Sequence, residues 1–166
     1  INKIYKNKAT LLDNFLEIKN KKKLSKIKSN KLVVGAMGRL VKKKGFDKLI
    51  EIFKQLENIH LIIAGDGPLM KSYRDLVKGQ NNINLLGWVN DKNSFFSKIN
   101  IFFSSSDEEP FGLVILEAMA RGVPVISTKC NGPLDIIKNN YNGILIEKNN
   151  KEAMKQAILK LKENTP

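Results

Sequence analysis

The residues best suited to chemistry lie in the segment 107–124. Two carboxylates, Glu109 and Glu117, stand eight positions apart across the start of a segment with helical periodicity. Eight residues make a little over two helical turns, and Glu109 precedes the helix, so both carboxylates can reach one cleft. The helix start also offers free backbone N–H groups that can bind an anion. These groups belong to residues Phe111, Gly112 and Leu113.

A second candidate region is the loop 38–45, which follows a short apolar run and precedes a helix. It begins with Gly38 and Arg39 and ends with Lys44 and Gly45. Glycine permits close backbone approach, and cations at a helix N-terminus suit a phosphate or diphosphate. Carboxylates, in turn, accept hydrogen bonds from neutral hydroxyls. A polyol joined to a diphosphate is a nucleotide sugar, which is the ligand class that these two regions predict together.

Structural interpretations of the same residues stay open. Glu109 could stabilise the start of its helix while Glu117 meets a partner in the core. The sequence Gly65-Asp66-Gly67-Pro68 consists of turn formers and is interpreted as a tight turn. It also lacks the third glycine of a dinucleotide fingerprint. An NAD-type oxidoreductase is disfavoured because the first loop, 38–45, lacks that fingerprint and its downstream acidic partner.

Other catalytic classes are excluded by the residue inventory. The one histidine, His60, starts an apolar run and is interpreted as structural. A Ser-His-Asp site, a Cys-His site and a histidine-rich metal site are therefore excluded. The single cysteine, Cys130, excludes an internal disulfide framework; it is interpreted as a buried thiol and fits a reducing compartment.

The elements that must position these residues follow from the hydrophobic pattern. Short runs of Val, Ile and Leu alternate with segments of helical period, which predicts an α/β fold: a Rossmann-like, doubly wound parallel sheet with helices on both faces. The predicted strands are Leu32 to Ala36, His60 to Ala64, Ile83 to Leu86, Ile101 to Ser104, Val123 to Ser127 and Gly143 to Ile146. The predicted helices are Phe46 to Phe53, Leu69 to Lys78, Asp91 to Lys98, Leu113 to Arg121, Pro133 to Asn139 and Lys151 to Lys162. Ligands of such sheets bind beyond the carboxyl ends of the strands, where both candidate regions lie.

The chain of 166 residues carries a formal net charge of +13. Only Arg39, Arg74 and Arg121 are arginines, and no aromatic interleaving accompanies the lysines, which argues against a nucleic-acid partner. Residues 1–31 hold ten lysines against Asp13 and Glu17. We interpret residues 1–30 as a basic linker that leads into a domain formed by 31–166. Weak attraction of this linker to an anionic membrane face is the alternative to a solvated segment.

Three motifs read together resemble the glycosyltransferase family 4 enzymes, retaining transferases of the GT-B fold. They are the Gly38-Arg39-Leu40 to Lys44-Gly45 loop, the Leu86-Gly87-Trp88-Val89 turn, and the stretch from Glu109 to Pro124 with its Glu-x7-Glu spacing. The resemblance covers nearly everything from Lys31 onward and identifies the chain as the C-terminal, donor-binding half of such an enzyme. The N-terminal acceptor domain of the family is expected to be missing from this chain.

The resemblance also implies roles for individual residues. Arg39 and Lys44 contact the diphosphate, Glu109 the hydroxyls of the transferred sugar, and Glu117 the ribose. Backbone groups near Gly38 and at Phe111, Gly112 and Leu113 face the sugar and phosphate, and Val89 pairs with the base through its main chain. Pro110 stands where the family usually has glycine, which removes one N–H donor beside the sugar site.

As a whole enzyme, the expected protein is a cytoplasmic hexosyltransferase of polysaccharide biosynthesis, with possible contact to the membrane face. It moves a hexosyl group from a nucleotide-diphosphate sugar to a saccharide or lipid-linked acceptor. No cofactor and no metal are expected, since the sequence lacks an Asp-x-Asp pair. The isolated domain should bind donor and turn over poorly, because half of the cleft is missing. The alternative from another class is a nucleotide or nucleotide-sugar binding module without transferase activity.

Overall fold

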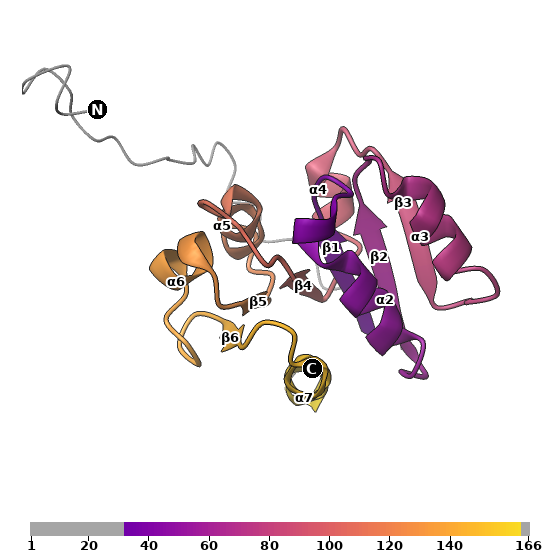
Figure 1. The fold of residues 1–166 in the computed structure, drawn as a ribbon. Helices are drawn as coiled ribbons and strands as arrows, with labels where there is room; N and C mark the ends of the chain where they lie inside the picture. The colour runs from indigo at the N-terminus through magenta and orange to yellow at the C-terminus, as the bar shows by residue number, and fades with distance from the viewer. Residues whose placement is uncertain (1–31, 164–166) are drawn as a thin grey trace, which may run out of the picture.

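The computed structural model describes residues 32–163, which form a six-stranded sheet in the order β3-β2-β1-β4-β5-β6 (Figure 1). All five neighbouring pairs of strands are parallel. The strands are β1 (Leu32–Met37), β2 (Ile59–Ala64), β3 (Ile83–Gly87), β4 (Ile101–Ser104), β5 (Val125–Thr128) and β6 (Ile144–Ile146). This confirms the predicted doubly wound α/β fold. The basic linker predicted for residues 1–30 lies outside the described residues.

Helices cover both faces of the sheet, because successive strand residues point to opposite sides. On β4, Ile101 and Phe103 join the core cluster beneath α2 and α7, whereas Phe102 joins the cluster beneath α4 and α5. The helices are α2 (Phe46–Phe53), α3 (Met70–Leu76), α4 (Lys92–Phe96), α5 (Leu113–Met119), α6 (Asn131–Ile136) and α7 (Lys151–Glu163). No helix within residues 32–163 has the length and apolar character needed to cross a membrane.

The α2 helix forms as its periodicity predicts. Its four apolar residues at positions i, i+3, i+4 and i+7 are all buried: Phe46, Leu49, Ile50 and Phe53. Burying each such side chain stabilises the fold by about 2 kcal/mol relative to exposure. The 42–44 stretch ahead of it, expected to be loop, forms one short 3-10 turn.

Several element boundaries differ from the predicted ones for identifiable reasons. The β5 strand begins at Val125 rather than Val123, since Pro124 has no N–H to donate to a neighbouring strand. The α4 helix begins one residue later than predicted, because the Asp91 side chain caps it. The α6 helix begins two residues earlier than predicted, at Asn131; Pro133 lies in its first turn, where a missing N–H costs little.

The order of the strands decides where a ligand can bind. Strands β1 to β3 are added toward one side of the sheet and β4 to β6 toward the other, so the strand order reverses between β1 and β4, which pair in parallel at the centre. The loops that follow these two strands therefore both leave the carboxyl ends of the strands, and they lead to helices on opposite faces of the sheet. In doubly wound sheets this point of divergence forms the binding crevice.

Candidate functional site

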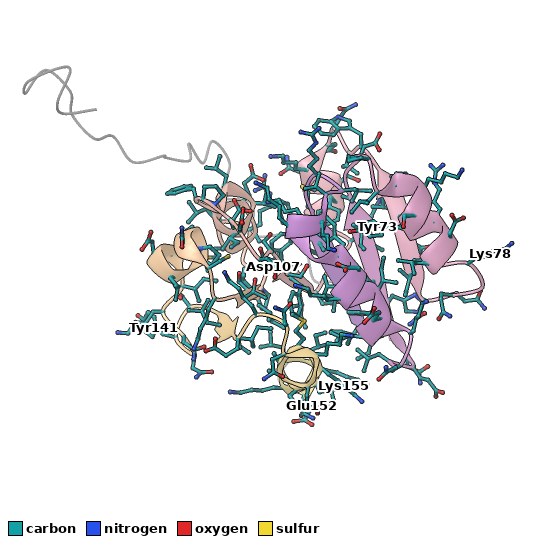
Figure 2. All side chains as sticks on the ribbon, viewed as in Figure 1. Tyr73, Lys78, Asp107, Tyr141, Glu152 and Lys155 are labelled. Atoms are coloured by element: carbon teal, nitrogen blue, oxygen red, sulfur yellow. The ribbon has the colours of Figure 1, made fainter. Side chains whose placement is uncertain are left out.

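A charged ladder joins the loop after β1 to the loop after β4. It consists of three ion pairs, each between a lysine of the first loop or α2 and an acidic residue of the second: Lys43–Glu108, Lys44–Glu109 and Lys48–Asp107. The nitrogen–oxygen distances in these pairs are 3.9, 2.5 and 2.5 Å, respectively. Figure 2 shows Asp107 near the middle of the molecule, beside α2.

Backbone hydrogen bonds hold the two loops at the same place. The Asp107 N–H donates to the carbonyl of Lys43 at 2.8 Å, and the Ser105 hydroxyl donates to the carbonyl of Lys44 at 2.8 Å. The Lys44–Glu109 pair is the most enclosed of the ladder, with 19% of each side chain exposed. The two residues predicted to contact diphosphate and sugar therefore hydrogen-bond each other in this structure.

An open cleft of about 730 Å³ lies beyond the carboxyl ends of β1, β2 and β3. Gly38 and Arg39 line it from the loop after β1, and Val89 lines it from the loop after β3. The exposed Arg39 has no ion-pair partner anywhere in residues 32–163. The cleft thus presents an unpaired guanidinium close to the centre of the sheet, which suits an anionic ligand.

The loop after β2 also lines this cleft and supports the loop after β1. Gly65 has a φ of +137°, and a Cβ atom there would lie 1.9 Å from the carbonyl oxygen of Gly38. The Leu40 N–H donates to the Asp66 carbonyl at 2.9 Å. Residues 65–68, which were predicted to form only a tight turn, therefore also line the cleft and support the loop after β1. The rule that ligands bind at the carboxyl ends of strands could have found it, since 65–68 follow β2.

Glu109 faces a separate, smaller hollow. This hollow of about 10 Å³ is lined by Gly112 and by the serines that follow β4, and it has room for no more than one water molecule. Met37 and Val114 line both the hollow and the larger cleft, so the two are adjacent. A sugar, which is many times larger than a water molecule, does not fit this hollow as it stands.

The loop that carries Glu109 is supported from α6. The Gly132 N–H donates to the carbonyl of Glu109 at 2.9 Å. Gly112 adopts the left-handed conformation, with a φ of +101°, directly before α5. Pro110 lies between them with no cis peptide bond. Phe111 and Leu113 line neither the cleft nor the hollow.

Glu117 is buried on α5 and is held by a lysine that the sequence did not single out. The Lys92 ammonium, at the start of α4, donates to both carboxylate oxygens at 2.7 and 3.0 Å. Lys92 itself lines the large cleft, whereas Glu117 does not. Glu109 and Glu117 are thus held by different lysines and share no cavity. Nothing in a sequence with 26 lysines marks Lys92 among the others.

The single cysteine and the single histidine line neither the cleft nor the hollow. Burial raises the pKa of the Cys130 thiol, in spite of its hydrogen bond with Thr128, so the thiol stays protonated and unreactive. This confirms the prediction of a buried thiol. His60 lies on β2 at the end away from the cleft. No group of three or more His, Cys, Asp or Glu residues among the described ones could hold a metal ion.

Comparison with known proteins shows which family the sequence matches. The family model described as "Glycosyl transferases group 1" matches residues 17–166. The chain is 38% identical over 131 residues to the lipopolysaccharide core biosynthesis glycosyltransferase LpsE of Rhizobium meliloti, covering 76% of this chain and 38% of that protein. It is 34% identical over 151 residues to the capsular polysaccharide biosynthesis glycosyltransferase CapM of Staphylococcus aureus, covering 86% of this chain and 40% of that protein.

Solved structures show the same fold. Anabaena HepE in complex with UDP-glucose superposes with a TM-score of 0.76 at 27% identity, covering 82% of this chain and 40% of that one. A point mutant of S. aureus TarM, in complex with Fondaparinux, alpha-GlcNAc-glycerol and UDP, superposes with a TM-score of 0.81 at 28% identity, covering 94% of this chain and 33% of that one. The chain therefore spans roughly 40% of the length of these two curated relatives.

Proposed function

The chain belongs to the group 1 glycosyltransferases, and from this we propose that it is the donor-binding domain of a retaining, metal-independent enzyme of glycosyltransferase family 4. The enzyme moves a hexosyl group from a nucleotide-diphosphate sugar to a saccharide or lipid-linked acceptor. Transfer needs an acceptor held against the donor, which in this proposal is the task of a further domain of the protein.

The single observation that carries the proposal is the cleft beyond the carboxyl ends of β1, β2 and β3, which is lined by Arg39, an arginine with no ion-pair partner among residues 32–163. Its volume of about 730 Å³ lies within the range of small-molecule pockets. Its walls come from loops after three adjacent strands, and Arg39 is not neutralised by any described residue. A nucleoside diphosphate would supply an anionic partner for Arg39. Asp66, the one acidic residue that lines the cleft, accepts a hydrogen bond from the Gly67 N–H.

Three of the proposed contact residues, Gly38, Arg39 and Val89, line the cleft. Arg39 and Lys44 stabilise the charge that develops on the diphosphate when the bond to the sugar breaks. Gly38 lets the backbone approach the phosphates, and the main chain of Val89 pairs with the base. Glu117 lies behind Lys92 on the ribose side.

The sugar subsite is proposed around Glu109. The Lys44 ammonium donates to the Glu109 carboxylate at 2.5 Å, so a bound donor competes for both groups. Diphosphate oxygens take hydrogen bonds from Lys44, and sugar hydroxyls donate to the freed carboxylate. The proposal also gives the sugar and phosphate contacts to backbone groups of Phe111, Gly112 and Leu113 at the start of α5; of these three residues, Gly112 lines the hollow beside Glu109.

The similar proteins support this choice of ligand and pathway. HepE was solved with UDP-glucose, and the TarM mutant with UDP and saccharide compounds. LpsE and CapM are named for lipopolysaccharide core and capsular polysaccharide biosynthesis. We propose the same general class of pathway for this protein, with the enzyme acting in the cytoplasm.

The test is a calorimetric titration of the chain with UDP, GDP and ADP and with their sugar conjugates. We expect one nucleotide to bind, with the affinity reduced about 10- to 100-fold by Arg39→Ala, since a hydrogen bond to a charged group contributes about 1.5–3 kcal/mol. Glu109→Ala should remove only the extra affinity of the sugar conjugate. Added EDTA should change neither affinity, because no metal takes part.

The matched control is Arg74→Ala, which removes an exposed arginine of α3 that does not line the cleft. It should leave every affinity unchanged. Equal losses in Arg39→Ala and Arg74→Ala would show that binding depends on net charge alone and would refute the proposed site. A folded chain that binds none of the nucleotides would refute the proposed function of the isolated domain.

A further inference from the structure

We propose that Lys48 and Asp107 form a pair of positioning residues for sugar recognition. Their ion pair holds the loops after β1 and β4 together when a donor separates Lys44 from Glu109. This inference rests on the proposed function, because that function gives a different part of the donor to each of the latter two side chains. Neither member of the positioning pair belongs to the motifs that carry the family resemblance, and neither has a proposed ligand contact.

Donor binding removes one of the ties between the two loops. The Lys44 ammonium donates to the Glu109 carboxylate at 2.5 Å, and only 19% of each side chain is exposed. A donor bound as proposed engages the lysine with its diphosphate and the carboxylate with its sugar. This ion pair then no longer joins the loop after β1 to the loop after β4.

The Lys48–Asp107 pair is the enclosed tie that remains. The Lys48 ammonium donates to Asp107 Oδ1 at 2.5 Å, with 16% of the lysine side chain and 34% of the aspartate side chain exposed. The exposed pair of the charged ladder, Lys43–Glu108, has a nitrogen–oxygen distance of 3.9 Å and side chains that are 54% and 74% exposed. Solvent screening leaves such a pair with little strength. Among the ion pairs of residues 32–163, one enclosed tie between the loops therefore persists when the donor is bound.

Lys48 is anchored at the start of α2, beside the loop that carries Lys44. It is the third residue of the helix, and its N–H donates to the carbonyl of Gly45 at 3.2 Å. A Cβ atom on Gly45, whose φ is +64°, would lie 2.3 Å from the carbonyl oxygen of Ser105. The backbones of the two loops are thus in direct contact at this point, and the Lys48 side chain reaches across the contact to Asp107.

Asp107 is anchored two residues before Glu109. Its N–H donates to the carbonyl of Lys43 at 2.8 Å, while its carboxylate accepts from Lys48. On the other side of this segment, the Gly132 N–H donates to the carbonyl of Glu109 at 2.9 Å. The backbone that carries Glu109 is therefore held from both ends, and the Lys48–Asp107 pair sets its position relative to α2, beside which Figure 2 shows Asp107.

A pair in this position affects the sugar more than the nucleotide. Arg39 and Val89, the proposed contacts of the phosphate and the base, line the cleft, whereas neither member of the pair does. Loss of the pair leaves those contacts in place and frees the segment that carries Glu109. Hydrogen bonds to the sugar then weaken, because a binding group must be held within about 0.5 Å of its productive position.

Two other roles for the pair make different predictions. If the pair only stabilises the fold, its loss weakens the binding of nucleotide and nucleotide sugar to the same extent. If it only sets the charge near the diphosphate, Lys48→Met and Asp107→Asn act in opposite directions, since one removes a positive charge and the other a negative one. Positioning predicts that both substitutions act in the same direction, and on the sugar alone.

The experiment titrates the chain with UDP, GDP and ADP and with the hexose conjugates of each, and takes the ratio of the affinity for the conjugate to that for the nucleotide. We expect a wild-type ratio of about 10 or more for the nucleotide that binds, the value of one hydrogen bond to a charged group. Lys48→Met and Asp107→Asn should each lower the ratio to about 3 or less, with the affinity for the nucleotide itself within about 2-fold of wild type.

Three further variants complete the design. Lys48→Arg should keep most of the ratio, since arginine retains the charge and the donors. The double variant Lys48→Met/Asp107→Asn should lose no more than either single variant, because both residues act through one contact. The matched control is Lys43→Met, which makes the same change to the exposed lysine of the ladder and should leave the ratio unchanged. Asp107→Asn serves as the test if Lys48→Met does not fold, as judged by circular dichroism.

The outcomes distinguish the inference from its premise. Nucleotide binding that Arg39→Ala weakens, with an unchanged ratio in Lys48→Met and Asp107→Asn, overturns the inference and leaves the proposed function standing. Opposite changes in these two variants also overturn it, as does a wild-type ratio near one. A folded chain that binds no nucleotide overturns the proposed function, and the inference with it.

Discussion

The charged ladder between the loops after β1 and β4 should contribute to stability in a graded way. We expect Lys44→Met to destabilise the fold most, Lys48→Met less, and Lys43→Met not measurably. Methionine keeps most of the length of the lysine side chain and removes its charge, so each variant tests one ion pair of the ladder.

The magnitudes follow from the burial of each pair. Breaking a fully buried ion pair costs about 3–5 kcal/mol, whereas an exposed pair contributes about 0–1 kcal/mol. Lys44 and Glu109 are each 19% exposed, which places the loss at about 2 kcal/mol. Asp107 is 34% exposed opposite Lys48, so the expected loss is about 1 kcal/mol. Lys43 and Glu108 are 3.9 Å apart and more than half exposed, and should contribute less than about 0.5 kcal/mol.

Urea denaturation and thermal melting of the four proteins would measure these losses. For a chain of this size, 2 kcal/mol corresponds to a decrease in Tm of about 4–8 °C, and 1 kcal/mol to about 2–4 °C. A double-mutant cycle of Lys44→Met with Glu109→Gln isolates the pair from the other effects of each substitution. Equal losses for Lys43→Met and Lys44→Met, or no coupling in the cycle, would refute the assignment of stability to burial of the pair.

Two further predictions concern the support of the site and the core beneath it. Gly65→Ala should destabilise the fold by about 3 kcal/mol, because its Cβ atom would lie 1.9 Å from the Gly38 carbonyl oxygen at a φ of +137°. The control is Gly79→Ala, at a φ of +80° with open space around it, which should cost about 1 kcal/mol. Comparable urea midpoints for the two variants would contradict this prediction. Burial, with Asp47 as the second cause, raises the pKa of Tyr73 to about 12, whereas the unfolded chain releases this proton near its ordinary value of about 10. The stability that the protonated phenol contributes is therefore fully present below about pH 10 and is lost as the pH rises toward 12. In melting experiments at alkaline pH, Tyr73→Phe should reduce the dependence of stability on pH between these values. An unchanged slope in the variant would disprove the role of Tyr73. Figure 2 shows Tyr73 on α3, and its ring meets Phe46 of α2 edge to face.

The comparison of sequence and structure shows why the fold was predictable. Each strand and helix is encoded locally: the run Ile101 to Ser104 reads as a buried strand, and the spacing from Phe46 to Phe53 reads as an amphipathic helix. Alternation of such segments implies a parallel sheet, and the carboxyl-end rule then points to the loops that carry Arg39 and Glu109. At Pro124 and at the Asp91 cap a single residue decides the boundary, and the predicted boundary was wrong at both places.

The partners within the candidate site could not be predicted in the same way. Lys44 and Glu109 are 65 positions apart and meet only because β1 and β4 are neighbours at the centre of the sheet. The contact between Gly65 and Gly38 depends likewise on the pairing of β1 with β2. A pattern read along the chain carries no information on these distances.

The parallel α/β architecture, the loops that carry the candidate site residues and the family motifs could all be recognised from the amino-acid sequence. This was possible because secondary structure and motif spacing are properties of neighbouring residues. Which cations are paired became clear from the folded structure. Arg39 stands without a partner among residues 32–163, Lys44 is occupied by Glu109, and Lys92 holds Glu117. Charge pairing depends on distance in space, and strand order sets that distance for residues remote in the chain.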